Sequence, residues 1–372
     1  MRSWEGLTQS SQNPQILKFS NPHIRLLLVR LREIGDVVFT TPAVRALEKR
    51  FPEAHISYLV EPAAAPIVAT NPHIDEVIIA PRGAGLASEV RLVRRLRSAQ
   101  FDVAIDFHGG PRASLLTWLS GAPIRVGYEV KGRSWMYTRR VGRPRELRAR
   151  HSVLNQWDLL TPFGIDPPRS DLDAVEMRVD PAAATSIAQR ITHAGIAAGD
   201  RLAVVHVSAG NPFRRWPIDS FVAVATGLAA GDSRCHVIVT SGPSERGAAD
   251  RVITESRACL APSERHRVLD FGELSLTELR AVLDDAAIYI GGDSGPLHVA
   301  ATSRVPIVGL YGPTLPARSA PWRGEYPAEA VEVPGLPCRP CDQRQCEPGD
   351  FRCLTRITPE QVLEAARRVL SL

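Results

Sequence analysis

The amino-acid sequence predicts an α/β protein made of two doubly wound domains that face a common cleft. Three observations support this prediction. The chain has 372 residues, a length that suits two domains of ordinary size. Short apolar runs typical of buried parallel strands alternate with segments of helical spacing along most of the chain. The alternation stops once, at the Pro-rich segment 166–170, and then begins again.

The first half opens with a polar segment, residues 1–22, which we expect to be a flexible leader because it lacks the apolar core of a signal peptide. Strands are predicted at 24–31, 55–60, 77–80 and 103–107, and helices at 37–50, 62–70, 86–98, 113–120 and 151–160. Together these elements predict a first domain over residues 23–175.

The second half repeats the pattern. Helices are predicted at 181–194, 217–229, 245–259 and 276–283, and strands at 202–207, 236–240, 268–271, 286–290 and 306–310. Thr358 and Pro359 are typical of a helix start and open a last helix at 361–370. We therefore expect a second domain at 176–357 and a C-terminal helix within 358–372, for which packing back on the first domain is one alternative.

Hydropathy and charge argue against a membrane-spanning protein and against a nucleic-acid-binding protein. No apolar run reaches the ~20 residues of a membrane-spanning helix, so we expect a cytoplasmic protein. The net charge of +5 is uneven, because residues 125–150 carry nine Lys or Arg and two Glu. Such a segment attracts phosphates or carboxylates, although a solvated loop is the alternative. No nucleic-acid-binding motif accompanies it, so nucleic acid is not an expected partner.

The cysteines fall into two groups. Cys235 and Cys259 stand alone, whereas the other four are clustered near the C-terminus as Cys338, Cys341, Cys346 and Cys353. A cytoplasmic cluster indicates structural zinc more than disulfides, but only the first pair has the usual knuckle spacing. A structural zinc site and structural cysteines that are reduced or occasionally oxidised therefore both stay open.

Two strand ends carry the residue types of a binding site. The stretch Ile290-Gly-Gly-Asp-Ser-Gly-Pro-Leu-His298 is typical of a strand, a tight turn and a helix start that can bind phosphate. Gly35 and Asp36 follow the first strand, where Asp36 could be a general base or a helix N-cap. In parallel sheets ligands bind beyond the carboxyl ends of the strands, so both turns are expected at one cleft.

Segment 206–217 follows another strand. Its glycine and the adjacent Arg214 and Arg215 could hold a diphosphate, with Trp216 packed beneath.

Several familiar motifs are absent or misleading. The sequence has neither a G-x-x-x-x-G-K-[ST] loop nor G-x-G-x-x-G after the first strand. Gly292-Asp-Ser-Gly-Pro296 is similar to the nucleophile loop of trypsin-like proteases, but an α/β chain is the wrong fold for that chemistry. Asp171 and Asp173 match a D-x-D metal motif by chance, because they lie in the Pro-rich linker.

A set of motifs in a fixed order resembles one family. The motifs are Leu31-Arg-Glu-Ile-Gly-Asp-Val-Val38, Thr41-Pro-Ala43, Asp102-Val-Ala-Ile-Asp-Phe-His-Gly109, Arg125-Val-Gly127, Phe213-Arg-Arg-Trp-Pro217, Ser241-Gly-Pro243 and Gly292-Asp-Ser-Gly-Pro-Leu-His298. From about Ile24 to the end, the chain resembles the glycosyltransferase family 9 heptosyltransferases, which add heptose to the lipopolysaccharide inner core.

The resemblance implies a GT-B fold, with two Rossmann-like domains facing a central cleft. It further implies acceptor binding by the first domain, sugar-nucleotide binding by the second, and inversion at the anomeric carbon with no essential metal or other cofactor. The implied partners are an ADP-heptose donor and a lipid A-linked inner-core acceptor, with peripheral contact at the inner membrane. Transfer of another sugar, another acceptor, and a catalytically silent sugar-nucleotide-binding protein remain alternatives.

Site residues follow from the same resemblance. Asp36 would be the general base, Arg214 (where the family usually has Lys) would contact the donor phosphates, and Glu245 the ribose hydroxyls. Asp293 would meet sugar hydroxyls, and backbone groups of Ser294 and Gly295 the phosphates. The full donor set is Arg214, Glu245, Asp293, Ser294, Gly295 and His298, and the acceptor set is Lys131, Arg133, Arg139 and Arg140.

Overall fold

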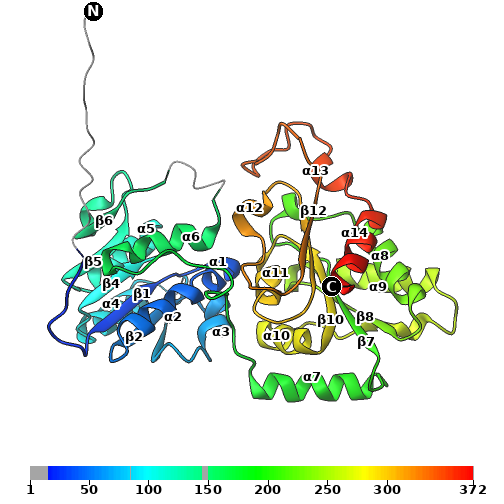
Figure 1. The fold of residues 1–372 in the computed structure, drawn as a ribbon, viewed down its shortest axis with the longest axis horizontal. Helices are drawn as coiled ribbons and strands as arrows, with labels where there is room; N and C mark the ends of the chain where they lie inside the picture. The colour runs from blue at the N-terminus through cyan, green and yellow to red at the C-terminus, as the bar shows by residue number, and fades with distance from the viewer. Residues whose placement is uncertain (1–15, 84, 145–149, 372) are drawn as a thin grey trace, which may run out of the picture.

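The computed structural model describes residues 16–83, 85–144 and 150–371, which form two α/β lobes side by side (Figure 1). Each lobe is built on a six-stranded parallel sheet, and the sheets have the strand orders β3-β2-β1-β4-β5-β6 and β12-β11-β10-β7-β8-β9. In each sheet, the direction in which successive strands are added changes once, between β1 and β4 in the first sheet and between β7 and β10 in the second. Ligand sites of doubly wound sheets lie beside such reversals, so the segments that follow these four strands are the ones to inspect.

The N-terminal lobe contains β1 (Arg25–Val29), α1 (Ile34–Val38), α2 (Thr41–Arg50), β2 (His55–Val60), η1 (Pro62–Ala64), α3 (Ala65–Val68), β3 (Glu76–Ile79), α4 (Leu86–Ser98), β4 (Val103–Asp106), α5 (Pro111–Leu119), β5 (Ile124–Tyr128), η2 (Ser134–Met136), β6 (Arg139–Val141), α6 (Ser152–Trp157) and η3 (Asp158–Phe163), where η marks a 3₁₀ helix.

The C-terminal lobe contains α7 (Pro181–His193), β7 (Arg201–His206), η4 (Pro212–Arg214), α8 (Ile218–Gly231), β8 (Cys235–Thr240), η5 (Pro243–Glu245), α9 (Arg246–Cys259), η6 (Arg265–Arg267), β9 (Val268–Asp270), α10 (Leu276–Asp285), β10 (Ala286–Gly292), α11 (Gly295–Ala300), β11 (Ile307–Tyr311), α12 (Pro316–Ser319), β12 (Ala328–Glu332), α13 (Arg352–Thr355) and α14 (Pro359–Leu370).

The central strands are covered on both faces, which explains their continuous apolar runs. In β1, Leu26, Leu27, Leu28 and Val29 are all fully buried, as expected where helices pack on both sides of a parallel sheet. All nine predicted strands are present, and the predicted α/β, doubly wound fold is confirmed.

Several elements differ from the prediction. The single helix expected at 37–50 is two helices, α1 and α2, so Asp36 lies inside a short helix rather than in the turn before one. Strands β5, β6 and β12 were not predicted. Part of the predicted flexible leader is packed, because Leu17 is buried and its N–H donates to the Pro162 carbonyl.

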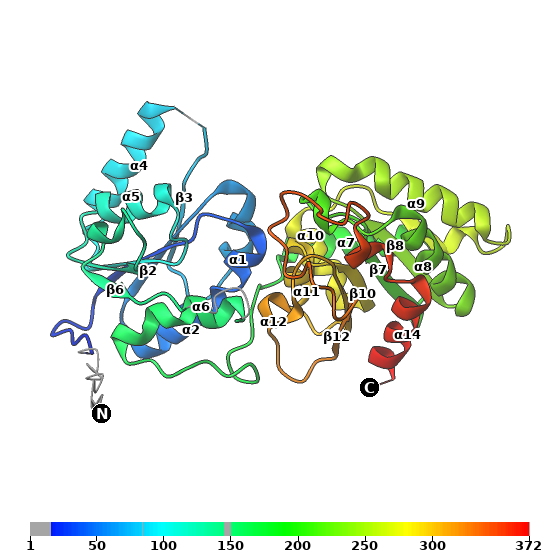
Figure 2. The same cartoon turned by 90° about the horizontal axis from the view of Figure 1, so that it is seen from above.

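The last helix packs within the C-terminal lobe. In α14, Val362, Ala365, Ala366 and Val369 are buried in the core that also holds residues of β7, β8, β10 and β11, and both views show the helix beside α8 (Figures 1 and 2). The alternative in which this helix packs back on the first lobe is therefore wrong.

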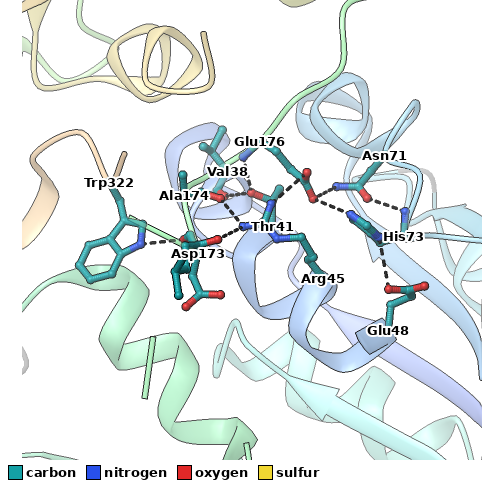
Figure 3. Close-up of polar contacts among 11 residues, drawn as sticks. Val38, Thr41, Arg45, Glu48, Asn71, His73, Asp173, Ala174, Glu176 and Trp322 are labelled. Carbon is teal, nitrogen blue, oxygen red and sulfur yellow. Dashed lines mark hydrogen bonds and ion pairs between the residues drawn. The ribbon is translucent and has the colours of Figure 1, made fainter. Parts of the chain in front are cut away.

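The end of the linker between the lobes, residues 173–176, is held by side chains of both lobes (Figure 3). On the N-terminal side, Arg45 donates to the Ala174 carbonyl at 2.9 Å and pairs with Glu176 at 3.1 Å, and Thr41 Oγ1 accepts the Glu176 N–H. On the C-terminal side, Trp322 Nε1 donates to the Asp173 carbonyl at 2.9 Å. The linker is thus a fixed part of the fold.

Among the described residues, none of the helices combines the length and the hydropathy that a membrane span requires.

Candidate active site

Asp36 lies beyond the end of β1, on α1, and its carboxylate pairs with Arg30. The Arg30 guanidinium also donates to the Phe107 carbonyl at 2.6 Å, at the end of β4. Gln156 Nε2 donates to the Asp36 carbonyl at 3.1 Å. Arg30 thus orients the Asp36 carboxylate and Gln156 holds its backbone, while the side chain is 37% exposed and therefore accessible to a ligand.

The turn after β4 lies against the same segment. The buried Asp106 carboxylate accepts the His108 and Gly109 N–H groups at 2.9 and 2.8 Å, and His108 Nδ1 lies 3.1 Å from the Arg32 carbonyl. Burial and the charge of Arg30 lower the pKa of His108 to about 4, so this imidazole is neutral near pH 7.

Asp293, at the end of β10, is at the centre of a second cluster. Its carboxylate accepts a hydrogen bond from Thr314 at 2.5 Å and lies 3.4 Å from Arg214 Nη1 and 3.5 Å from His298 Nε2. Burial alone would raise the pKa of this carboxyl, but the hydrogen bond and charge of His298, with Arg214 and Thr314, hold it at about 2. Only 3% of the side chain is exposed, so Asp293 orients Arg214 and His298 and has little surface for a ligand.

The two clusters meet where α1 packs against α11. A β-carbon on Gly35 would lie 2.2 Å from His298 Cδ2, and one on Gly295 would lie 2.9 Å from Ile34 Cγ2. The His298 ring also packs on Phe39, with centroids 4.5 Å apart. Glycine is required on both helices for this approach. The contact brings the segment that carries Asp36 to the segment that carries Ser294 and His298.

A cavity of about 490 Å³ opens beside this contact. The N-terminal lobe contributes Glu33, Ile34, Gly35 and Ala63, and the C-terminal lobe contributes residues 206, 208–210, 240–245, 273–276, 279 and 294–296. The buried hydroxyl of Ser294 has no hydrogen-bond partner among the described residues. A buried polar atom without a partner beside a cavity is typical of a ligand-binding position.

Glu245 lies in the wall of this cavity, where Arg215 pairs with it. Nearby, His206 bridges Thr240 Oγ1 at 2.9 Å and Ser208 Oγ at 3.0 Å, and Ser208 Oγ accepts the Gly242 N–H at 2.8 Å. Burial lowers the pKa of His206 to about 4, which leaves a neutral ring that holds the segments after β7 and β8 together.

The predicted acceptor residues lie at the β6 edge of the first sheet, either in β6 or in the segment that precedes it. Lys131, Arg139 and Arg140 are exposed, and Arg133 donates to the Gly109 carbonyl at 2.9 Å, in the turn beside His108. Within the basic segment, Arg145 and Arg148 lie outside the described residues.

The cysteine loop, residues 334–351, lies next to Arg214. Gln343 Oε1 accepts hydrogen bonds from Arg214 Nε at 2.8 Å and Asn211 Nδ2 at 2.9 Å. Its thiols and the following Cys353 line a separate cavity of about 440 Å³ with Phe213. In the part of the chain that the structure describes, no three His, Cys, Asp or Glu side chains gather as metal ligands.

Three residues of the site were not predicted from the sequence as functional residues. Arg30, Thr314 and Gln343 contact Asp36, Asp293 and Arg214, and no local pattern marks them. Arg215 was expected to hold a diphosphate with Arg214, and in the structure it pairs with Glu245.

Comparison with known proteins identifies the family of the chain. The model of Glycosyltransferase family 9 (heptosyltransferase) matches residues 89–351. The chain is 27% identical to Lipopolysaccharide heptosyltransferase 3 of Escherichia coli, over 78% of this chain and 84% of that protein.

Two solved structures share the fold. One is a glycosyl transferase family 9 protein from Veillonella parvula, with a TM-score of 0.78, 24% identity and coverage of 94% of this chain and 97% of that one. The other is the E. coli ADP-heptose lps heptosyltransferase II, with a TM-score of 0.74, 19% identity and coverage of 94% and 99%. The GT-B arrangement expected from the sequence is thereby confirmed. With more than half of its length matched, the chain belongs to glycosyltransferase family 9, the heptosyltransferase family.

Proposed function

We propose that the protein transfers heptose from ADP-heptose to a hydroxyl of the lipopolysaccharide inner core, with inversion and with Asp36 as the general base. The observation that carries this proposal is the packing of Gly35 against His298. It brings α1, which carries the accessible Asp36 carboxylate, against a cavity lined mainly by the other lobe; Gly35 lines this cavity and Asp36 is the next residue. Family membership supports heptosyl transfer, and the related E. coli protein is named for heptose transfer to lipopolysaccharide.

The donor would occupy the cavity between the lobes. Arg214, held by Asp293 and Gln343, would place its positive charge on the diphosphate, together with the Ser294 hydroxyl and the backbone at Gly295. Glu245, oriented by Arg215, would accept from the ribose hydroxyls. Because Asp293 is buried against three partners, we assign it to the orientation of Arg214 and His298 rather than to the sugar hydroxyls.

The chemistry would be a single displacement. The acceptor oxygen forms a bond to the anomeric carbon as the bond from that carbon to the diphosphate oxygen breaks, and attack from the opposite face inverts the configuration. The acceptor proton passes to Asp36, and ADP leaves with the electron pair. Positive charge at the leaving group stabilises the transition state, and loss of one such contact typically costs about 10²–10³-fold in rate.

Asp36→Asn tests the base assignment. The amide preserves the shape of the side chain but cannot accept the proton, so transfer should fall at least about 10³-fold. Affinity for ADP, measured by calorimetry, should stay within about twofold. Asp219→Asn, on the surface of α8, is the matched control and should keep both properties. Near-full transfer by the Asp36 variant would refute the proposed role.

A donor panel tests the sugar. ADP-heptose, ADP-glucose and UDP-glucose would each be incubated with a heptose-deficient core acceptor, and the products identified by mass spectrometry. Exclusive use of ADP-heptose is expected. Preferred use of another donor would assign a different sugar to this enzyme, and no transfer with any donor would favour a sugar-nucleotide-binding protein without activity.

A further inference from the structure

Three apolar side chains stand exposed together on the N-terminal lobe. Leu115 and Trp118 lie on α5 and are 41% and 38% exposed, and Trp135 on η2 is 56% exposed. The two indole rings meet edge to face, with centroids 5.4 Å apart. We call these three residues the tryptophan patch.

The patch is held in place by the structure beneath it. Leu115 and Trp118 are one helical turn apart on the outer face of α5, whose inner face buries Ala113 and Leu116. The segment that carries Trp135 is fixed by Arg125, which donates to the Met136 carbonyl at 2.7 Å, and by Ser134, which donates to the Val130 carbonyl at 2.8 Å. The large apolar rings therefore have a fixed position at the surface.

Cations outnumber carboxylates in the segment that carries Trp135. Residues 129–141 contain Lys131, Arg133, Arg139 and Arg140 and one acidic residue, the exposed Glu129. Next to Trp118, Arg97 of α4 donates to the Leu119 carbonyl at 3.0 Å. Exposed tryptophan in a segment of net positive charge is the composition of a surface that binds the interface of an anionic membrane.

We infer that the tryptophan patch is a membrane-binding surface, which places its indole rings at the depth of the lipid headgroups and its cations against anionic lipid phosphates. The indole ring is suited to this depth because it combines a large apolar area with one polar N–H. Each nearby cation is expected to raise partitioning to an anionic surface roughly fivefold. This surface goes beyond the proposed transfer reaction and depends on no sugar.

The patch is connected to the candidate active site through Arg133. This residue lies between Lys131 and Trp135, and its guanidinium donates to the Gly109 carbonyl, in the turn whose His108 contacts the Arg32 carbonyl. Membrane contact at the patch would thus hold the Asp36 side of the cleft near the lipid surface.

Co-sedimentation with saccharide-free vesicles tests the inference. The full chain should bind vesicles of phosphatidylcholine with 30% phosphatidylglycerol and should bind pure phosphatidylcholine at least tenfold more weakly. Trp118→Ala/Trp135→Ala should lower binding to the anionic vesicles roughly tenfold or more, because it removes the apolar area. Leu370→Ala, on α14 of the other lobe, is the matched control for an exposed apolar residue and should bind like the wild type.

Charge reversal and fluorescence provide independent measurements. Lys131→Glu should weaken binding at least roughly fivefold, whereas Arg234→Glu, an exposed cation of the C-terminal lobe, should not. Vesicles should shift the tryptophan emission of the wild type to the blue and leave that of the folded double variant unshifted. If the double variant does not fold, Trp135→Ala alone replaces it.

Equal binding to both vesicle types, no binding to either, or unchanged binding by the folded tryptophan variant would each overturn the inference. If the patch binds another protein and not lipid, the full chain will fail to bind either kind of vesicle, which is one of these contradicting outcomes.

Discussion

At the scale of single residues, Gly35 fixes how closely the two lobes approach. Its α-carbon faces the His298 ring, and a β-carbon there would overlap Cδ2 at 2.2 Å. The ring has little freedom to withdraw, because it is packed on Phe39 and lies within ion-pair distance of the buried Asp293. One methyl group at this position would therefore disturb both the interface and the cluster that holds Arg214.

We predict that Gly35→Ala lowers the free energy of unfolding by about 1–3 kcal/mol, the usual cost of overpacking a buried contact. The rate of transfer should fall at least tenfold, because separation of α1 from α11 moves Asp36 away from the cavity. Urea unfolding and steady-state kinetics measure the two effects. Gly247→Ala is the matched control: its β-carbon would meet nothing within 4 Å, so stability should stay constant or rise by up to about 1 kcal/mol. Equal behaviour of the two variants would contradict the steric argument.

The sequence predicted the residues at strand ends and missed the residues that orient them. Asp36, Ser294 and Arg214 follow buried strands, where general rules place ligand-binding groups. Arg30 precedes Asp36 by only six residues, but nothing in the local pattern distinguishes it from a surface arginine. The contact of Gln343 with Arg214 depends on a loop conformation that the sequence does not specify, including a positive φ of 58° at Gln343 itself.

At the scale of elements, the cysteine loop supports the donor side of the site by two routes. Arg339, at its start, donates to the Thr314 carbonyl at 2.7 Å and pairs with Glu332 at 2.6 Å, and Thr314 in turn donates to Asp293. Further along, Gln343 accepts from Arg214. The loop therefore orients both the arginine and the carboxylate that holds it.

We predict that Gln343→Ala weakens ADP binding roughly three- to thirtyfold, because the side chain accepts two hydrogen bonds worth about 1 kcal/mol each, one of them from Arg214 itself. Calorimetry with ADP measures this change. Gln345→Ala, an exposed glutamine of the same loop, is the matched control and should bind ADP like the wild type. Unchanged affinity in the Gln343 variant would show that Arg214 keeps its orientation without the loop.

Elements were predictable where burial made their sequences uniform. The central strands β1, β4, β7 and β10 were found, as were the edge strands β3 and β9, whereas the edge strands β6 and β12 and the strand β5 beside β6 were not. β6 is an arginine pair with one valine, and β12 alternates small and acidic residues because one side is exposed. The break between α1 and α2 did have a signal, since Pro42 lies in the first turn of α2.

At the scale of the whole molecule, the interface between the lobes contains a buried histidine. His151 packs between Phe39 and Trp322, with ring centroids 5.2 and 4.7 Å away. Its Nε2–H donates to the Ala320 carbonyl at 2.9 Å, and its Nδ1 accepts the Val153 N–H at 3.2 Å at the start of α6. The contact with Val153 requires the neutral ring, because a proton on Nδ1 would remove the acceptor, whereas the bond to Ala320 can form in either protonation state.

We predict that acidification destabilises the protein through His151. Burial and, to a lesser extent, the charge of His298 lower the pKa of His151 to about 4, against an ordinary value of about 6.5. As pH falls through 6.5, the His151 ring of the unfolded chain binds a proton while that of the folded protein does not. The free energy of unfolding therefore decreases between pH 6.5 and 4. The loss is about 2 kcal/mol at pH 5.

Urea unfolding of wild type and His151→Gln at several pH values measures this effect. The stability difference between the two proteins should be constant from pH 8 to 7 and should change by about 2 kcal/mol, in favour of the variant, from pH 7 to 5. Parallel pH curves over the whole range would contradict the role of His151.

The contact between Gly35 and His298 also has a consequence for how the protein is made. Every strand of the first sheet is synthesised before the linker, so the N-terminal lobe can fold while β10 and α11 are still to be translated. During that interval Ile34 and Phe39 lack the surface of α11 that later covers them. The nascent chain on the ribosome thus carries a finished lobe with an uncovered apolar edge, the kind of surface that chaperones bind, until translation passes His298.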